Sequence, residues 1–94
     1  MIVRFTASAQ ADIQSIFDYI ARDNPFVARR VVSDIEQATH RLGRFPLSGR
    51  IGAVESTREL VIPRLPFIVV YRVGEAIIDI IAVFHAAQDR PRGH

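Results

Sequence analysis

His85, which closes the last apolar run of the chain, is the side chain best suited to acid–base chemistry. Histidine titrates near neutral pH and can act as a general acid or base. Arg58, Arg64 and Arg72 precede it, and a guanidinium can bind a phosphate through two hydrogen bonds. Together they could cleave RNA without a metal, with the 2′-hydroxyl as nucleophile and arginines stabilising the phosphate charge. The alternative is structural: His85 ends a strand and hydrogen-bonds to the backbone or to Asp89, and an isolated histidine favours this.

Other catalytic and ligand-binding patterns do not occur in the sequence. The chain has no cysteine, so it offers no thiolate ligand and no disulfide, and its three histidines (His40, His85 and His94) lack metal-ligand spacing. It has no glycine-rich phosphate loop and no serine in a nucleophile-elbow context. We therefore expect no metal and no other cofactor.

All twelve basic residues are arginine, and they are unevenly distributed. Six of them lie from Arg41 to Arg72, a segment with only two acids, Glu55 and Glu59, although the whole chain carries a net charge of only +2. This basic segment suits an acidic partner, whether nucleic acid or protein. A single surface arginine is more often simply solvated.

The 94 residues, 49% of them hydrophobic, fit one domain, residues 1–94, with a flexible tail from about 89 to 94. No apolar run approaches the ~20 residues of a membrane-spanning helix. The first residues lack the apolar stretch of a signal peptide. The absence of cysteine suits a reducing compartment, so we expect a cytoplasmic protein.

Two helices and four strands are expected to position these side chains. Apolar residues recur at steps of three and four in two consecutive segments, which is the period of a helix. Thr6 or Ser8 can cap the first helix, and Asn24 followed by Pro25 signals the start of the second. The expected order is a strand at 2–5, helices at about 8–22 and 25–42, and strands at about 57–62, 67–73 and 76 to 84 or 85. This β-α-α-β-β-β order predicts an α+β fold with a helical hairpin packed on a small, mainly antiparallel sheet.

The alternation of side chains along the last two strands predicts which face each residue occupies. The even-numbered residues from 78 to 84 are all apolar and are predicted to face the helices. Asp79 and His85 then face the other way, and Arg72 of the preceding strand shares their side, with Ile68 among them. A register slip of one residue would reverse these faces.

Aromatic residues are predicted to be packing residues. Tyr71 has apolar neighbours in its strand, which favours packing over a catalytic phenol. The six phenylalanines lack the surface spacing of a base-stacking platform and are predicted to lie in the core. They are Phe5, Phe17, Phe26, Phe45, Phe67 and Phe84.

Six short motifs follow one another along nearly the whole chain. They are Ser8-Ala9-Gln10-Ala11-Asp12-Ile13, Asp18-Tyr19-Ile20, Phe45-Pro46-Leu47-Ser48-Gly49-Arg50, Arg58-Glu59-Leu60, Val70-Tyr71-Arg72-Val73 and Phe84-His85-Ala86-Ala87-Gln88-Asp89. In this order and spacing the chain resembles the RelE/ParE superfamily of bacterial type II toxin–antitoxin toxins, also called plasmid stabilisation proteins. The resemblance implies the same β-α-α-β-β-β fold that the periodicity predicts.

The resemblance implies one of two activities. RelE-like members cut messages in the ribosomal A site, and ParE-like members inhibit DNA gyrase. RelE-like enzymes carry an arginine where this chain has Ile68, which the strand phase places beside His85, and an aliphatic side chain cannot stabilise a phosphate. They also often use lysines, which this chain lacks. The motifs look more like the ParE side, although the family usually has arginine where Gln88 stands.

We therefore expect a ParE-like inhibitor of DNA gyrase that a small, acidic, ParD-like antitoxin neutralises in a toxin–antitoxin hetero-oligomer. The antitoxin tail is expected to be disordered alone and to fold on the toxin. Arg58, Arg64, Arg72 and His85 are the residues expected to bind the target or the antitoxin. One alternative is a RelE-like mRNA interferase that acts on ribosome-bound message, with His85 as acid–base and Arg72 or Arg64 on the phosphate. Another is a non-toxic module that only binds its antitoxin.

Overall fold

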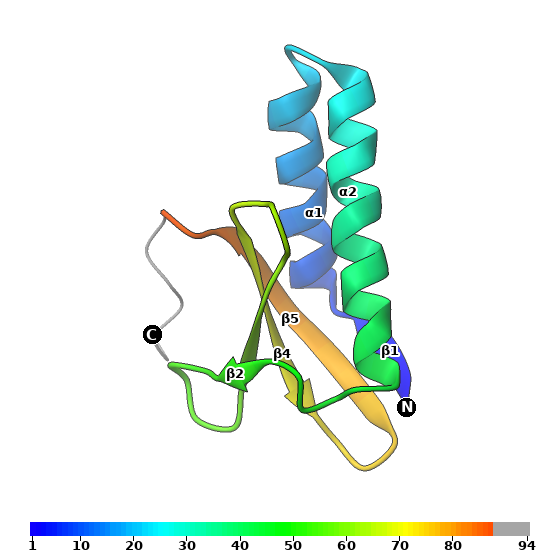
Figure 1. Cartoon of the computed structure of the whole chain (residues 1–94), viewed down its shortest axis with the longest axis vertical. Coiled ribbons are helices and arrows are strands. Elements are labelled where there is room, and N and C mark those ends of the chain that lie inside the picture. Colours follow the sequence, from blue (N-terminus) through cyan, green and yellow to red (C-terminus); the bar gives the residue numbers. More distant parts are fainter. Residues whose placement is uncertain (88–94) are drawn as a thin grey trace.

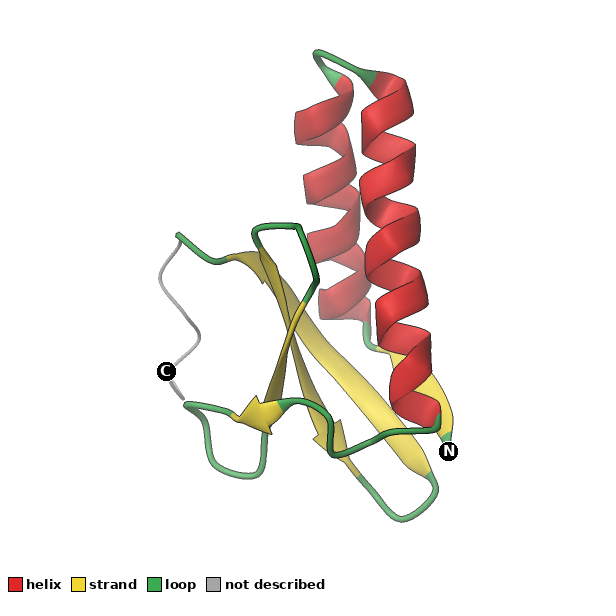
Figure 2. Cartoon of the chain, viewed as in Figure 1, coloured by secondary structure: helices red, strands yellow, loops and turns green. Residues whose placement is uncertain are grey.

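A five-stranded sheet with the order β1-β5-β4-β3-β2 carries a hairpin of two helices on one face in this computed structural model, which describes residues 1–87 (Figures 1 and 2). The elements are β1 (Ile2–Phe5), α1 (Ala7–Ala21), α2 (Pro25–His40), a 3₁₀ turn η1 (Arg41–Gly43), β2 (Arg50–Ile51), β3 (Arg58–Val61), β4 (Phe67–Val73) and β5 (Ile77–His85). The predicted α+β fold is confirmed, with the short strand β2 added. The predicted tail lies outside the described residues.

Both helices begin where the sequence signals predict. The Thr6 hydroxyl accepts a hydrogen bond from the Ala9 N–H at 3.2 Å and caps α1. The Asn24 side chain accepts from the Phe26 and Val27 N–H groups at 3.1 and 3.2 Å. These caps satisfy N–H groups that a helix leaves unpaired in its first turn. The short link before Asn24 makes the helices antiparallel (Figure 1).

The main core lies between the helices and the sheet. From β4, Phe67, Val69 and Tyr71 face the helices, as the alternation predicts. Their partners include Ile35 of α2 and Leu42 of η1, both fully buried. Burial of large apolar side chains is the main stabilising term for such a layer.

A β-bulge in β5 reverses the predicted facing of its second half. Val70 pairs with Ala82, but Tyr71 pairs with Ile80, so Ile81 is an extra residue. Residues 78 and 80 face the helices as predicted, whereas Ala82 and residue 84 belong to a second cluster on the other face. An extra residue shifts the alternation by one, because side chains point to opposite faces at each step.

The prediction that His85 shares a face with Arg72 and Ile68 is therefore wrong. His85 lies opposite Phe67 in the register, and cross-strand partners share a face, so it faces the helix side. Ile68, 3% exposed, packs on the other face. Arg72 lies opposite Asp79 on that other face, as predicted. The argument that an aliphatic Ile68 replaces a cation beside His85 thus loses its geometric basis.

Two of the predicted core phenylalanines are also exposed. Phe26 is 77% exposed at the start of α2, and Phe45 is 60% exposed in the loop after η1. Phe67 and Phe84 are buried as predicted. The two exposed rings stand outside the helix–sheet interface, where their burial would require a partner.

Side chains at the start of α1 form hydrogen bonds with the part of the β5 edge that β1 does not pair. β1 pairs with β5 only as far as Ile80. Beyond that point the Thr6 hydroxyl donates to the Ile80 carbonyl at 2.8 Å, and an Asp12 oxygen accepts from the Val83 N–H at 2.9 Å. Unpaired strand edges need such partners when they are partly buried.

Replacing Asp12 by alanine is expected to lower the free energy of unfolding by about 1–2 kcal/mol, because the Val83 N–H would lose its acceptor. The Asp12→Asn variant keeps an oxygen at this position and is expected to lose less. Urea unfolding of both variants measures the difference. Equal losses would contradict a role of Asp12 as hydrogen-bond acceptor for β5.

Candidate protein-binding groove

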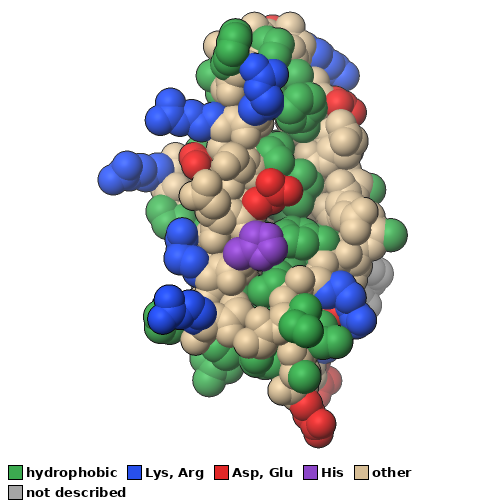
Figure 3. Space-filling view, turned by 90° about the vertical axis from the view of Figure 1, so that its right-hand side faces the viewer, with side chains coloured by type: hydrophobic (Ala, Val, Ile, Leu, Met, Phe, Trp, Pro, Cys, Tyr) green, Lys and Arg blue, Asp and Glu red, His purple; other side chains and the backbone are tan. Residues whose placement is uncertain are grey.

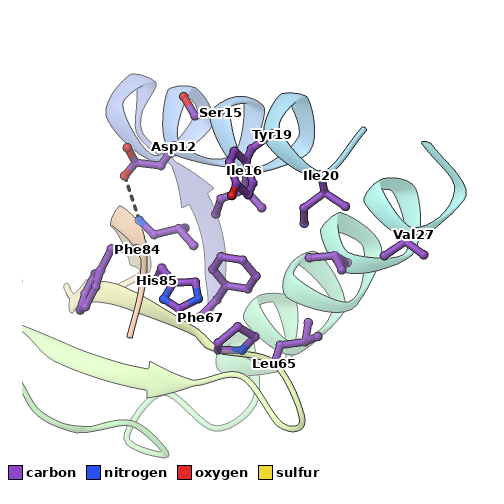
Figure 4. Close-up of a pocket in the computed structure, with 13 residues that line it drawn as sticks. Asp12, Ser15, Ile16, Tyr19, Ile20, Val27, Leu65, Phe67, Phe84 and His85 are labelled. Carbon is purple, nitrogen blue, oxygen red and sulfur yellow. Dashed lines mark hydrogen bonds between the residues drawn. The ribbon is translucent and has the colours of Figure 1, made fainter. Parts of the chain in front are cut away.

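A groove of about 830 Å³ opens between the distal part of the helical hairpin and the end of the sheet where β4 starts and β5 finishes (Figure 4). Most of its lining is apolar. The lining residues are Asp12, Ser15, Ile16, Tyr19, Ile20, Val27, Val31, Leu65, Pro66, Phe67, Val83, Phe84 and His85.

The groove exists because the helices extend past the sheet (Figure 1). Ile16 and Ile20 of α1 still pack against the core, but Tyr19 is 71% and Val27 is 44% exposed. In Figure 4 the helix residues and Phe67 form facing walls. A concave, mainly apolar surface of this kind fits the apolar face of a peptide segment better than a charged substrate.

His85 lies at the sheet side of this groove. Its Nδ1 accepts a hydrogen bond from the Ala87 N–H at 3.0 Å, so the proton of the neutral ring is assigned to Nε2. The ring packs edge-on against Phe67, with 5.5 Å between centroids. Asp12 is the only other ionisable lining residue besides Tyr19, and no arginine of the described chain lines the groove. The described lining residues beside His85 are therefore mainly apolar.

The Arg58 side chain forms hydrogen bonds with the backbone of the loop between η1 and β2. Its Nη1 donates to the carbonyl oxygen of Gly49 at 2.8 Å and to that of Leu47 at 3.4 Å. The side chain lies on the helix side of the sheet, opposite Tyr71 in the register. This arginine, predicted to bind a partner, thus contacts the backbone of its own chain.

Arg64 and Arg72 do not line the groove beside His85. Arg64 is exposed in the β3–β4 connection, with a φ of 67°, and borders a shallow hollow with Asp34 and Arg41. Arg72 is exposed on the face of the sheet away from the helices. The structure therefore does not bring the predicted arginines together around His85.

The loop after η1 is fixed by buried polar contacts. The Tyr71 hydroxyl donates to the Pro46 carbonyl at 2.8 Å and accepts from the Gly49 N–H at 2.9 Å, although Tyr71 is fully buried. Glu59, 3% exposed, accepts from Arg50 at 3.1 and 3.3 Å. Tyr71 is a packing residue, as predicted, and it also positions this loop.

The Tyr71→Phe variant is expected to lose about 1–2 kcal/mol of unfolding free energy, because the Gly49 N–H and Pro46 carbonyl would lose a buried partner. Packing of the ring should persist. Chemical denaturation of this variant and the wild type measures the loss, and an unchanged midpoint would contradict the anchoring role of the hydroxyl.

Within residues 1–87, no group of three or more histidine, aspartate or glutamate side chains is arranged to hold a metal ion. The helices of the same part of the chain are too short or too polar to cross a membrane.

The fold is that of a toxin from a type II toxin–antitoxin system. The family model described as "ParE toxin of type II toxin-antitoxin system, parDE" matches residues 3–90. The chain belongs to this ParE toxin family, within the RelE/ParE superfamily.

Curated relatives agree with this assignment. The chain is 40% identical to the candidate toxin Y4kP of Sinorhizobium fredii over 90 residues, covering 96% of this chain and 93% of that protein. It is 34% identical to toxin RelE2 of Caulobacter vibrioides over 86 residues, with 92% and 96% covered.

Solved structures show the same fold. A chain of the chromosomal ParDE system from P. aeruginosa matches with a TM-score of 0.81 and 30% identity, over 90% of this chain and 95% of that one. A chain of the RelBE2 toxin–antitoxin complex from Mycobacterium tuberculosis matches with a TM-score of 0.66 and 23% identity, over 89% and 95%. The second likeness concerns the fold alone.

Several important residues escape prediction from the sequence. Tyr19 and Val27 continue the apolar pattern of their helices past the end of the sheet, and helix periodicity alone does not show where the sheet stops. Asp12 falls on the polar side of its helix pattern, yet it contacts β5. The apolar residues beside one proline and two arginines in the segment 44–51 were a usable signal for an exposed surface.

Proposed function

We propose that this toxin acts as an inhibitor of DNA gyrase by binding it, without catalysing a reaction, and that a cognate antitoxin neutralises it. None of the predicted arginines lines the groove with His85, and this observation carries the proposal. Arg72 lies on the other face of the sheet, and Arg58 holds the loop backbone. Acid–base cleavage of RNA requires a cation close to the same phosphate.

The comparisons support the ParE-like side of the superfamily. The matching family model is the ParE one, and the ParDE structure is 30% identical to this chain. As the resemblance implies, ParE-like members inhibit gyrase. A toxin of this kind needs a binding surface and no catalytic constellation.

The antitoxin is proposed to occupy the groove. Both solved structures come from toxin–antitoxin systems. The groove fits an amphipathic segment whose apolar side chains at helical spacing pack against Ile16, Ile20 and Phe67. A segment that is disordered alone would fold on this surface, and burial of its apolar side chains would offset the conformational entropy lost on folding.

A supercoiling assay with purified gyrase tests the proposed activity. The toxin is expected to inhibit supercoiling in proportion to its concentration, and addition of the antitoxin should restore it. Unaffected supercoiling at saturating antitoxin-free toxin would refute gyrase as the target. A ribosome-dependent message-cleavage assay on the same preparation would then detect the alternative, an mRNA interferase.

A further inference from the structure

We infer that residues 44–51, here called the Phe45 loop, form the surface that docks on the toxin's protein target, through an apolar patch surrounded by acidic groups on the target. This inference deepens the proposed function, since gyrase is the target proposed above. Three large apolar side chains of the loop stand in solvent: Phe45 is 60%, Leu47 is 65% and Ile51 is 74% exposed. Exposed apolar side chains that cluster within one short segment are typical of interaction sites.

The backbone of the Phe45 loop is held rigidly although its apolar side chains are exposed. Tyr71 binds the loop at Pro46 and Gly49, and Arg58 donates to the carbonyls of Leu47 and Gly49. A loop that needed only to connect two elements would not require a fully buried tyrosine and a guanidinium to fix its backbone. A fixed conformation lowers the entropy lost on binding, so these contacts preorganise the exposed side chains.

Close packing at Gly49 reinforces this rigidity. A Cβ at this position would lie 2.6 Å from the Tyr71 hydroxyl and 2.9 Å from the Glu59 carbonyl oxygen. The loop therefore lies directly on β3 and β4. The buried Glu59 pairs with Arg50 and so fixes the second end of the loop.

The charge around the loop indicates an acidic partner. Residues 37–54 contain three arginines, Arg41, Arg44 and Arg50, and no aspartate or glutamate. The Arg44 guanidinium lies 5.9 Å from the centroid of the Phe45 ring. The space-filling view from the α2 side shows arginine side chains along one margin of the molecule and at other places on this face (Figure 3). Aromatic and arginine side chains in one patch are the usual composition of binding hot spots.

The Phe45 loop lies away from the groove. The groove borders the Phe67 and His85 end of the central strands, whereas the loop contacts Tyr71, four residues further along β4. At the rise of a strand this separates the two anchor points by roughly 13 Å, and Figure 1 shows the loop at the opposite end of the sheet.

Substitution of two of the three exposed apolar side chains of the loop tests the inference. The variant Phe45→Ser with Leu47→Ser is expected to abolish growth arrest on induced expression and to weaken gyrase binding at least ~30-fold, the effect of losing a hot spot. Its antitoxin affinity should stay within about 3-fold of wild type, because the groove is intact. The matched control is Phe26→Ser, which removes a 77% exposed phenylalanine with an arginine 4.8 Å from its ring and should behave as wild type.

A second variant changes only an exposed charge and is expected to keep the fold. Arg44→Glu reverses an exposed charge and should weaken gyrase binding about 10-fold, most strongly at low salt. Growth arrest retained in the serine variant would overturn the inference. A loss of antitoxin affinity in the serine variant would also overturn the inference. So would the finding that wild type is a dimer and the serine variant a monomer. If wild type does not bind gyrase but the variant loses growth arrest and keeps antitoxin affinity, the proposed target fails and the surface stands.

Discussion

A toxin carrying Tyr19→Ser and Val27→Asp is expected to bind its antitoxin at least ~100-fold more weakly than wild type while still arresting growth. Both side chains line the groove and are already exposed, at 71% and 44%, so their replacement should not unfold the chain. A partner segment that buries them would lose an aromatic anchor and meet a charge in an apolar site. Calorimetric titration of the antitoxin into each toxin measures the change.

The control for this prediction is Val61→Asp. Val61 is 49% exposed on β3 and does not line the groove, so the same substitution should leave antitoxin affinity nearly unchanged. Co-expression provides the cellular counterpart, in which the antitoxin rescues cells carrying the control variant and not those carrying the groove variant. Equal affinities for the two variants would place the antitoxin elsewhere on the toxin.

Replacing Gly49 by alanine is expected to destabilise the fold by about 3 kcal/mol, near the upper end of overpacking penalties. The new methyl group would lie 2.6 Å from the Tyr71 hydroxyl and 2.7 Å from a carbon of its ring, and Tyr71 is fully buried, so it cannot move aside easily. The backbone at Gly49 does not have the positive φ that favours glycine, so the cost is steric. Guanidinium unfolding measures it.

Ser48→Ala is the neighbouring control for Gly49→Ala. Ser48 is exposed, and its substitution should change the unfolding free energy by less than about 0.5 kcal/mol. If Gly49→Ala unfolds at the same denaturant concentration as wild type, the loop is not packed on Tyr71 as described. The rigidity on which the Phe45 loop inference depends would then be lost as well.

The elements of the fold could be predicted from the sequence because their signals are local. Thr6 and Asn24 mark helix starts through contacts made within three residues, and helix periodicity follows from one segment at a time. The faces of β5 could not be predicted, because residues 80–84 are all apolar and show no alternation. The hydrophobic pattern of the sequence therefore does not reveal the extra residue Ile81.

The candidate site was harder to predict because it combines distant segments. The groove brings α1 and α2 together with residues 65–67 and 83–85, and no spacing rule links such separations. His85 was singled out for its chemistry, and the structure gives it an apolar setting. Arg58 illustrates the same difficulty, since an arginine that binds carbonyls of its own chain and one that binds a partner have the same sequence signature.

Growth arrest by the double variant His85→Ala with Arg72→Ala tests most directly whether toxicity comes from binding or from RNA cleavage. Expression of the variant from an inducible promoter, with mapping of message ends in the same cultures, compares it with wild type. Our account predicts that the variant arrests growth as wild type does and that neither protein produces cleaved messages. Loss of arrest together with loss of message cleavage that wild type performs would contradict it.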